Sequence, residues 1–192
     1  MQLLLISDIF GQNSGLDDLA NALTTIGIDI QILDPYQGKR LHFMDGAHAY
    51  QSYLDQCGHD YYCQMVINIL AKISQSTSDK IIIIAFSAGA SAAWQALGSN
   101  KIETEQVKQF IGFYPSQIRH HLHLTPKVMT QLFFPAHEEH FSVDTTIAEL
   151  SRKNTVRCIK TKGLHSFMNP LSINFDQIHT QYFIKTLLKI IN

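Results

Sequence analysis

The alternation of apolar and polar positions along the chain predicts short strands separated for the most part by helices. Strands are expected at residues 2–6, 28–33, 81–84, 107–114, 128–134 and 155–160. Apolar residues at helical spacing predict helices at 16–23, 60–74, 90–97, 143–153 and 175–191. Residues 37–50 and 116–127 lack such a period and are expected to be long loops. Apolar strands that alternate with helices indicate a doubly wound α/β fold, with a parallel sheet covered on both faces.

The most informative stretch is residues 79–97, which reads DKIIIIAFSAGASAAWQAL. Its four consecutive isoleucines predict a strand buried on both faces, and the alanine-rich part that follows has helical spacing. A serine between such a strand and helix is the layout of a nucleophile elbow. The strained turn needs small residues two positions before and after Ser87, and these are Ala85 and Gly89. The alternative is an ordinary strand-to-helix turn in which Ser87 is an N-cap.

Composition indicates a globular protein and gives no sign of a charged partner. The 192 residues are enough for one domain, expected to span 1–192, and the formal net charge is −1. This balance argues against a nucleic acid or a membrane surface as a partner. No apolar run approaches the roughly 20 residues that span a bilayer, and the apolar start predicts a strand and not a signal peptide. Three cysteines, an odd number, suggest reduced thiols, so a cytoplasmic location is expected.

The loops that follow the strands hold the groups of a hydrolytic triad. In a parallel sheet the functional site lies beyond the carboxyl ends of the strands. Ser87 follows the third strand, Glu138 and Glu139 follow the fifth, and His165 follows the sixth. A serine nucleophile needs a histidine base and an acid that orients it, and the order serine, acid, histidine is that of the α/β-hydrolases. Taken singly, His165 could be a surface histidine and the glutamates solvated loop charges.

The same edge of the sheet should also supply the donors that stabilise a transition-state oxyanion. The amide of Ala88, at the start of the helix after Ser87, is one expected donor, and the amide of Ile9 is the other. The histidine-rich segments do not have the spacing of a metal site, since His137 and His140 are three and not four residues apart. No glycine-rich phosphate loop follows the first strand. Neither a metal nor an organic cofactor is therefore expected.

Three short motifs make the chain resemble the dienelactone hydrolase branch of the α/β-hydrolases. They are Asp8–Gly11 (DIFG), Asp34–Gly38 (DPYQG) and His165–Pro170 (HSFMNP). The resemblance runs over nearly the whole chain and implies a small, lidless member of the fold. It also implies that the six strands are ordered 2-1-3-4-5-6, without the two leading strands of the larger sheet.

The resemblance extends to individual site positions, with departures. Ser87 stands where the founding enzymes have a cysteine nucleophile, which implies serine esterase chemistry. Aligning Ala136 with the glycine of the family's acid loop puts Glu139 at the acid position, whereas a shift of one residue gives Glu138 that role. Asp8 matches a family carboxylate, and Asn169 stands where the founding enzymes bind their substrate with an arginine. Dienelactone itself is therefore not the expected substrate.

The sequence thus predicts a serine hydrolase, of the carboxylesterase or lactonase kind, that cleaves a small ester or lactone through an acyl-enzyme on Ser87. Asp8, Phe10 and Arg119 are the expected substrate contacts. Two alternatives remain open at this point. One is a non-catalytic small-molecule-binding protein that retains the fold, and the other is acyl transfer by the same residues.

Overall fold

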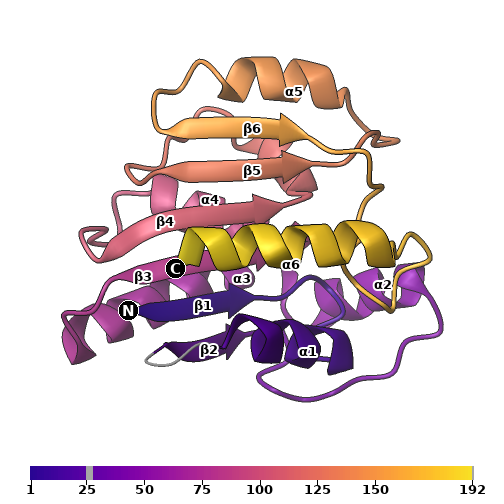
Figure 1. Ribbon diagram of the computed structural model, residues 1–192, viewed down its shortest axis with the longest axis horizontal. Coiled ribbons are helices and arrows are strands. Elements are labelled where there is room, and N and C mark those ends of the chain that lie inside the picture. The colour runs from indigo at the N-terminus through magenta and orange to yellow at the C-terminus, as the bar shows by residue number, and fades with distance from the viewer. Residues whose placement is uncertain (25–27, 192) are drawn as a thin grey trace.

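A parallel sheet forms the centre of the computed structural model, which describes residues 1–24 and 28–191 (Figure 1). In these residues the sheet has six strands in the order β2-β1-β3-β4-β5-β6, and all neighbours are parallel. The strands are β1 (Gln2–Ile6), β2 (Asp29–Leu33), β3 (Ile81–Phe86), β4 (Val107–Phe113), β5 (Thr130–Phe134) and β6 (Val156–Lys160). Both the doubly wound class and the strand order implied by the resemblance are confirmed.

Helices cover both faces of the sheet. They are α1 (Ser14–Leu23), α2 (Gly46–Gln56), α3 (Gly58–Ser76), α4 (Ser87–Gly98), α5 (Val143–Leu150) and α6 (Gln177–Ile191), with a short 3₁₀ helix, η1, at Ser116–His120. Apolar residues of α1 and α6 pack on one face, and those of α2, α3, α4 and α5 pack on the other. None of the helices in the described residues combines the length and apolar character that crossing a bilayer requires.

Strand β3 is the axis of this packing because it is apolar at every position. All six of its residues are buried. Successive side chains of a strand point to opposite faces, so Ile81 and Ile83 join the core under α3 and α4, whereas Ile82 and Ile84 join the core under α1 and α6. A run of β-branched residues without polar alternation is what a strand buried on both faces requires.

The expectation of a loop throughout residues 37–50 is wrong, because helix α2 begins inside it at Gly46. The Asp45 side chain caps this helix by accepting a hydrogen bond from the His48 amide at 2.8 Å. Only Ala49 and Tyr53 of α2 are buried, so the helix presents a short apolar stripe that the sequence pattern did not reveal. Other boundaries differ from expectation by a few residues, and the expected helix end before Gly27 lies outside the described residues.

A buried carboxylate ties together two loops at the carboxyl edge of the sheet. Asp8, just after β1, accepts a hydrogen bond from the Phe10 amide at 3.0 Å and another from Asn169 Nδ2 at 2.7 Å. Asn169 lies in the loop after β6, and its side-chain oxygen accepts from the Leu171 amide at 2.9 Å. Burial raises the pKa of Asp8, and the hydrogen bonds from Asn169 and Phe10 oppose that rise only in part.

We expect Gly89→Ala to destabilise the fold, because helix α4 crosses the end of β1 with no room for a side chain. A Cβ at Gly89 would overlap the Ser7 carbonyl oxygen and lie 2.8 Å from Ile6 Cγ2. Overpacking of this kind costs about 1–3 kcal/mol of the free energy of unfolding, measured by urea denaturation. Gly46→Ala is the matched control, since a Cβ there has no neighbour within 4 Å. Equal stability of the two variants would contradict the close packing.

Because the pKa of Asp8 is raised, ionisation of this carboxyl group should lower the free energy of unfolding. A folded-state pKa above the unfolded value, near 3.8, means that the stability contributed by protonated Asp8 is complete below that pH. It is lost as the pH rises through the folded pKa. The free energy of unfolding of the native protein, relative to that of the non-titrating variant Asp8→Asn, should therefore fall between about pH 4 and neutrality. A difference that stays constant or grows over this range, in urea titrations at several pH values, would contradict the assignment.

Candidate active site

Ser87 occupies the sharp turn between β3 and α4. Its backbone φ is 47°, in the left-handed region that residues other than glycine rarely adopt. The flanking Ala85 is fully buried, and Gly89 fits against the backbone of β1. The N-cap of α4 is Phe86, and the Ser87 hydroxyl is turned to a different partner. The alternative in which Ser87 is only an N-cap is therefore wrong.

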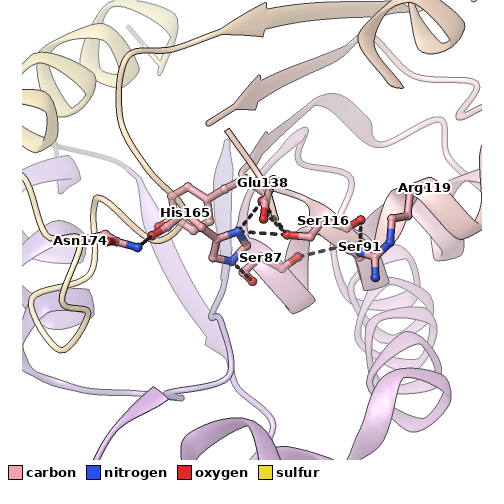
Figure 2. A network of polar contacts seen from close by, with 8 residues as sticks. Ser87, Ser91, Ser116, Arg119, Glu138, His165 and Asn174 are labelled. Atoms are coloured by element: carbon pink, nitrogen blue, oxygen red, sulfur yellow. Dashed lines mark hydrogen bonds and ion pairs between the residues drawn. The ribbon is translucent and has the colours of Figure 1, made fainter. Parts of the chain in front are cut away.

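The partner of Ser87 is His165, in the loop after β6. Ser87 Oγ lies 2.9 Å from His165 Nε2, and the contact joins residues 78 positions apart in the chain (Figure 2). Two features fix the loop around His165. Asn174 Nδ2 donates a hydrogen bond to the His165 carbonyl at 3.0 Å, and the Phe167 side chain is fully buried. The prediction that these two side chains meet at the carboxyl edge of the sheet agrees with the structure.

Glu138, and not Glu139, is the carboxylate beside the histidine. Glu138 Oε1 lies 2.6 Å from His165 Nδ1, whereas the Glu139 side chain is exposed. Glu139, the preferred acid of the sequence analysis, is therefore one residue away from the carboxylate that contacts His165. The Ala136 amide donates to the Gly163 carbonyl at 2.8 Å, which extends the pairing of β5 and β6 into both loops. A carboxylate only accepts hydrogen bonds, so Nδ1 carries the proton and Nε2 is free to accept from Ser87.

Ser116 is a fourth member of this network that sequence reasoning missed. Its Oγ lies 2.9 Å from Glu138 Oε1 and 3.0 Å from His165 Nδ1 (Figure 2). It is the first residue of η1, within the segment expected to be a loop. The available signal was its position directly after Tyr114-Pro115 at the end of β4, since the carboxyl ends of parallel strands share one edge.

The two expected oxyanion donors lie beside Ser87. Ile9 and Ala88 line the same cavity as Ser87 and His165. Ala88 is in the first turn of α4, where helix amides have no intrahelical partner. The loop that carries Ile9 is fixed by two bonds, because the Tyr36 hydroxyl donates to the Ile9 carbonyl at 2.7 Å and Asp8 accepts from the Phe10 amide.

The three expected substrate contacts have different surroundings. Arg119 lines the cavity of Ser87, where its Nη1 donates to the Ser116 carbonyl at 2.8 Å and its guanidinium lies 5.2 Å from the centre of the Phe141 ring. Phe10 lines a second cavity that also contains Ser87. Asp8 lines neither, because it is buried with both carboxylate oxygens bonded, beside a separate cavity of about 30 Å³. The expectation that Asp8 contacts substrate is therefore not supported.

None of the three cysteines lines either cavity that contains Ser87. Burial raises the pKa of Cys57 and Cys158 to about 11 and that of Cys63 above its ordinary value, which disfavours the thiolate at neutral pH. In residues 1–24 and 28–191, no three His, Cys, Asp or Glu side chains are grouped as metal ligands would be.

The sequence and the fold both have recognisable relatives. The uncharacterised Bacillus subtilis protein YczH is 27% identical over 187 residues, which cover 96% of this chain and 87% of YczH. A putative dienelactone hydrolase from Klebsiella pneumoniae superposes with a TM-score of 0.73 at 13% identity, covering 99% of this chain and 85% of its own. A dienelactone hydrolase-like promiscuous phosphotriesterase from metagenomic libraries gives a TM-score of 0.70 at 14% identity, covering 99% and 84%.

The structural likenesses, at such low identity, show a shared α/β-hydrolase fold. Family membership rests on the sequence, which matches the dienelactone hydrolase family over residues 2–174. This range includes the turn at Ser87 and the loops that carry Glu138 and His165. The chain belongs to the dienelactone hydrolase family.

Proposed function

We propose that the protein is a serine hydrolase that cleaves a small ester or lactone through an acyl-enzyme on Ser87. The observation that carries this proposal is the chain of two hydrogen bonds from Ser87 Oγ to His165 Nε2, at 2.9 Å, and from His165 Nδ1 to Glu138, at 2.6 Å. The chain begins at a serine whose backbone is left-handed, as a nucleophile elbow requires.

In the proposed reaction, His165 Nε2 accepts the hydroxyl proton as Ser87 Oγ attacks the carbonyl carbon. The Ile9 and Ala88 amides stabilise the oxyanion of the tetrahedral intermediate. As the intermediate collapses, His165 gives the proton to the departing alkoxide and the acyl-enzyme remains. Water, deprotonated by the same histidine, then attacks the acyl group and releases the acid and free Ser87.

Glu138 and Ser116 act through the histidine and are positioning residues. Glu138 holds the His165 tautomer in which Nε2 can accept a proton, and it stabilises the imidazolium that forms. The Ser116 hydroxyl can donate to the same carboxylate oxygen, which fixes the carboxylate beside Nδ1. Hydrogen bonds to a charged group contribute about 1.5–3 kcal/mol, so a measurable part of the rate is expected to depend on Ser116.

Two features bear on the substrate. Asn169, at the position of a family arginine, donates its amide hydrogen to buried Asp8 and so has a structural partner. The founding family's way of holding a substrate carboxylate is therefore absent at this position. Arg119 is a cation on one wall of the Ser87 cavity. We propose that it binds a polar or negatively charged substituent of the substrate.

The alternative of a non-catalytic binding protein rests on Ala85 and on the unusual acid loop. A non-catalytic protein would be favoured if neither glutamate lay near the His165 ring and if Ser87 made no hydrogen bond to that ring. Both bonds are present, which favours catalysis. Acyl transfer to an acceptor other than water uses the same residues, and analysis of the products separates it from hydrolysis.

The two adjacent glutamates provide a matched test of the acid. We expect Glu138→Gln to lower kcat for p-nitrophenyl acetate by about 10²–10⁴-fold, because Nδ1 loses the carboxylate that holds the tautomer. Glu139→Gln, which changes an exposed side chain in the same loop, should stay within about two-fold, the range of a surface substitution.

Ser87→Ala should lower kcat for p-nitrophenyl acetate as much as Glu138→Gln does. It should also abolish labelling by a fluorophosphonate probe, which reacts with activated serines. Turnover that is unchanged in Ser87→Ala would disprove the proposed nucleophile. An equal loss in Glu138→Gln and Glu139→Gln would disprove the proposed acid.

Removal of the Ser116 hydroxyl should slow the chemistry without removing the triad. We expect Ser116→Ala to lower kcat by about 10-fold and to shift the far-downfield proton resonance of His165 Nδ1–H. Ser116→Thr, which keeps the hydroxyl, should restore most of the rate. Ser91→Ala is the control, because Ser91 Oγ donates only to the Ser87 carbonyl, at 3.1 Å. An unchanged resonance in Ser116→Ala would argue against a positioning role.

A further inference from the structure

Two cavities of different size meet at the Ser87–His165 pair. One, of about 310 Å³, has Arg119 in its wall, and the other, of about 630 Å³, has Asn174 in its wall. Figure 2 places Arg119 and Asn174 on opposite sides of Ser87 and His165. An ester carbonyl at Ser87 has two substituents, the acyl group and the alkoxy group. Each substituent can therefore extend into one cavity.

The larger cavity is bounded by apolar side chains from three segments. They are Phe10 after β1, Met44 before α2, and Leu171 and Ile173 after β6. Ile173 and Met44 are the two most exposed large apolar side chains of the described residues, at 99% and 85%, and Leu171 is 51% exposed. Single exposed apolar residues are common, but several around one opening indicate a surface that binds an apolar group.

One part of the wall of this cavity is held by aromatic packing. Phe10 is buried, and its ring packs edge-to-face on Phe43 with centroids 6.0 Å apart. Asp45, which apart from His165 is the one titratable side chain among its lining residues, accepts a hydrogen bond from the His48 amide at the start of α2. Phe10 is thus a fixed apolar part of the wall, and neither Lys nor Arg is among the residues that line the cavity.

The smaller cavity differs in having a cation and more hydrogen-bond donors among its lining residues, although Ile9 and Phe141 also line it. Its lining includes Arg119, His59, His140 and Gln117, all of which can donate hydrogen bonds. A long alkyl or aryl group in this cavity would cover those donors without satisfying them, which is costly. A long apolar substituent is therefore directed to the larger cavity, which has about 630 Å³ against about 310 Å³ for the smaller one.

We propose that the substrates are esters in which one substituent is an uncharged medium-length alkyl or aryl group that lies against Phe10, Met44, Leu171 and Ile173. This inference rests on the proposed ester hydrolysis and specifies its substrate class. The shape of the site admits the apolar group as either the acyl or the alkoxy substituent, so the test has to compare both.

The decisive comparison uses ethyl acetate with two isomers, ethyl hexanoate and hexyl acetate, which carry the same added methylenes on opposite sides of the carbonyl. Each methylene that the cavity covers should raise kcat/KM by about 2–4-fold. At least one isomer should therefore exceed ethyl acetate by about 10-fold or more. If both isomers are hydrolysed no faster than ethyl acetate, the apolar site is disproved while ester hydrolysis stands.

Substitutions at two exposed isoleucines test whether a preference for one ester isomer comes from this cavity. Ile173→Asp should lower kcat/KM for the favoured isomer by about 5–10-fold, through lost apolar contact and an added charge, and should lower it less for ethyl acetate, which has four fewer methylenes to cover. Ile178→Asp is the control, because Ile178 is 80% exposed on α6 and lines neither cavity. Equal effects of the two substitutions on the favoured isomer would overturn the assignment.

A binding measurement separates failure of this inference from failure of the proposed function. In Ser87→Ala, NMR titration with hexyl acetate and ethyl hexanoate should shift the backbone amides of Phe10, Leu171 and Ile173. Such shifts without hydrolysis by the native protein would retain the apolar site and disprove the hydrolase. Shifts confined to other surfaces would disprove the apolar site, whatever the activity of the native protein.

Discussion

The left-handed backbone of Ser87 is the constraint on which the rest of the site depends. Such a conformation costs about 1–3 kcal/mol in a residue other than glycine, so the surroundings have to enforce it. Strand β3 is buried on both faces on one side of the turn, and Gly89 allows α4 to lie directly on the Ser7 carbonyl on the other. The same close approach brings the loop after β1 next to the start of α4. The serine and the two amides proposed as oxyanion donors therefore come from a single packing contact.

The parts of the fold and site that the sequence predicted are those fixed by local pattern and by topology. The isoleucine run identified the central strand, and small residues around Ser87 identified the turn. His165 could be paired with Ser87 across 78 residues because all carboxyl ends of a parallel sheet lie at one edge. The sheet itself supplies this long-range information, so no knowledge of the loops was needed.

The errors fall where a side chain's position depends on contacts that the local sequence does not encode. Glu138 and Glu139 are chemically identical neighbours, and only the folded path of the loop, which begins with the bond between Ala136 and Gly163, shows that Glu138 is the one beside His165. Ser116 joins the network through the path of η1, which has no apolar period. Helix α2 was missed because only one short stripe of it is buried. In each case tertiary contacts select among local options that the sequence leaves equal.

The location of the proposed acid and base has a consequence for how the protein would lose the proposed activity. Glu138 and His165 follow β5 and β6, and β6 is one of the two edge strands of the sheet, with Val156 as its one buried residue. Ser87 follows the most buried strand. Local opening is easiest where apolar contact is least. Partial fraying of β6 would separate the histidine from the serine while the core around β3 stays folded. Mild heating is therefore expected to abolish the proposed activity reversibly, at temperatures below the cooperative loss of secondary structure.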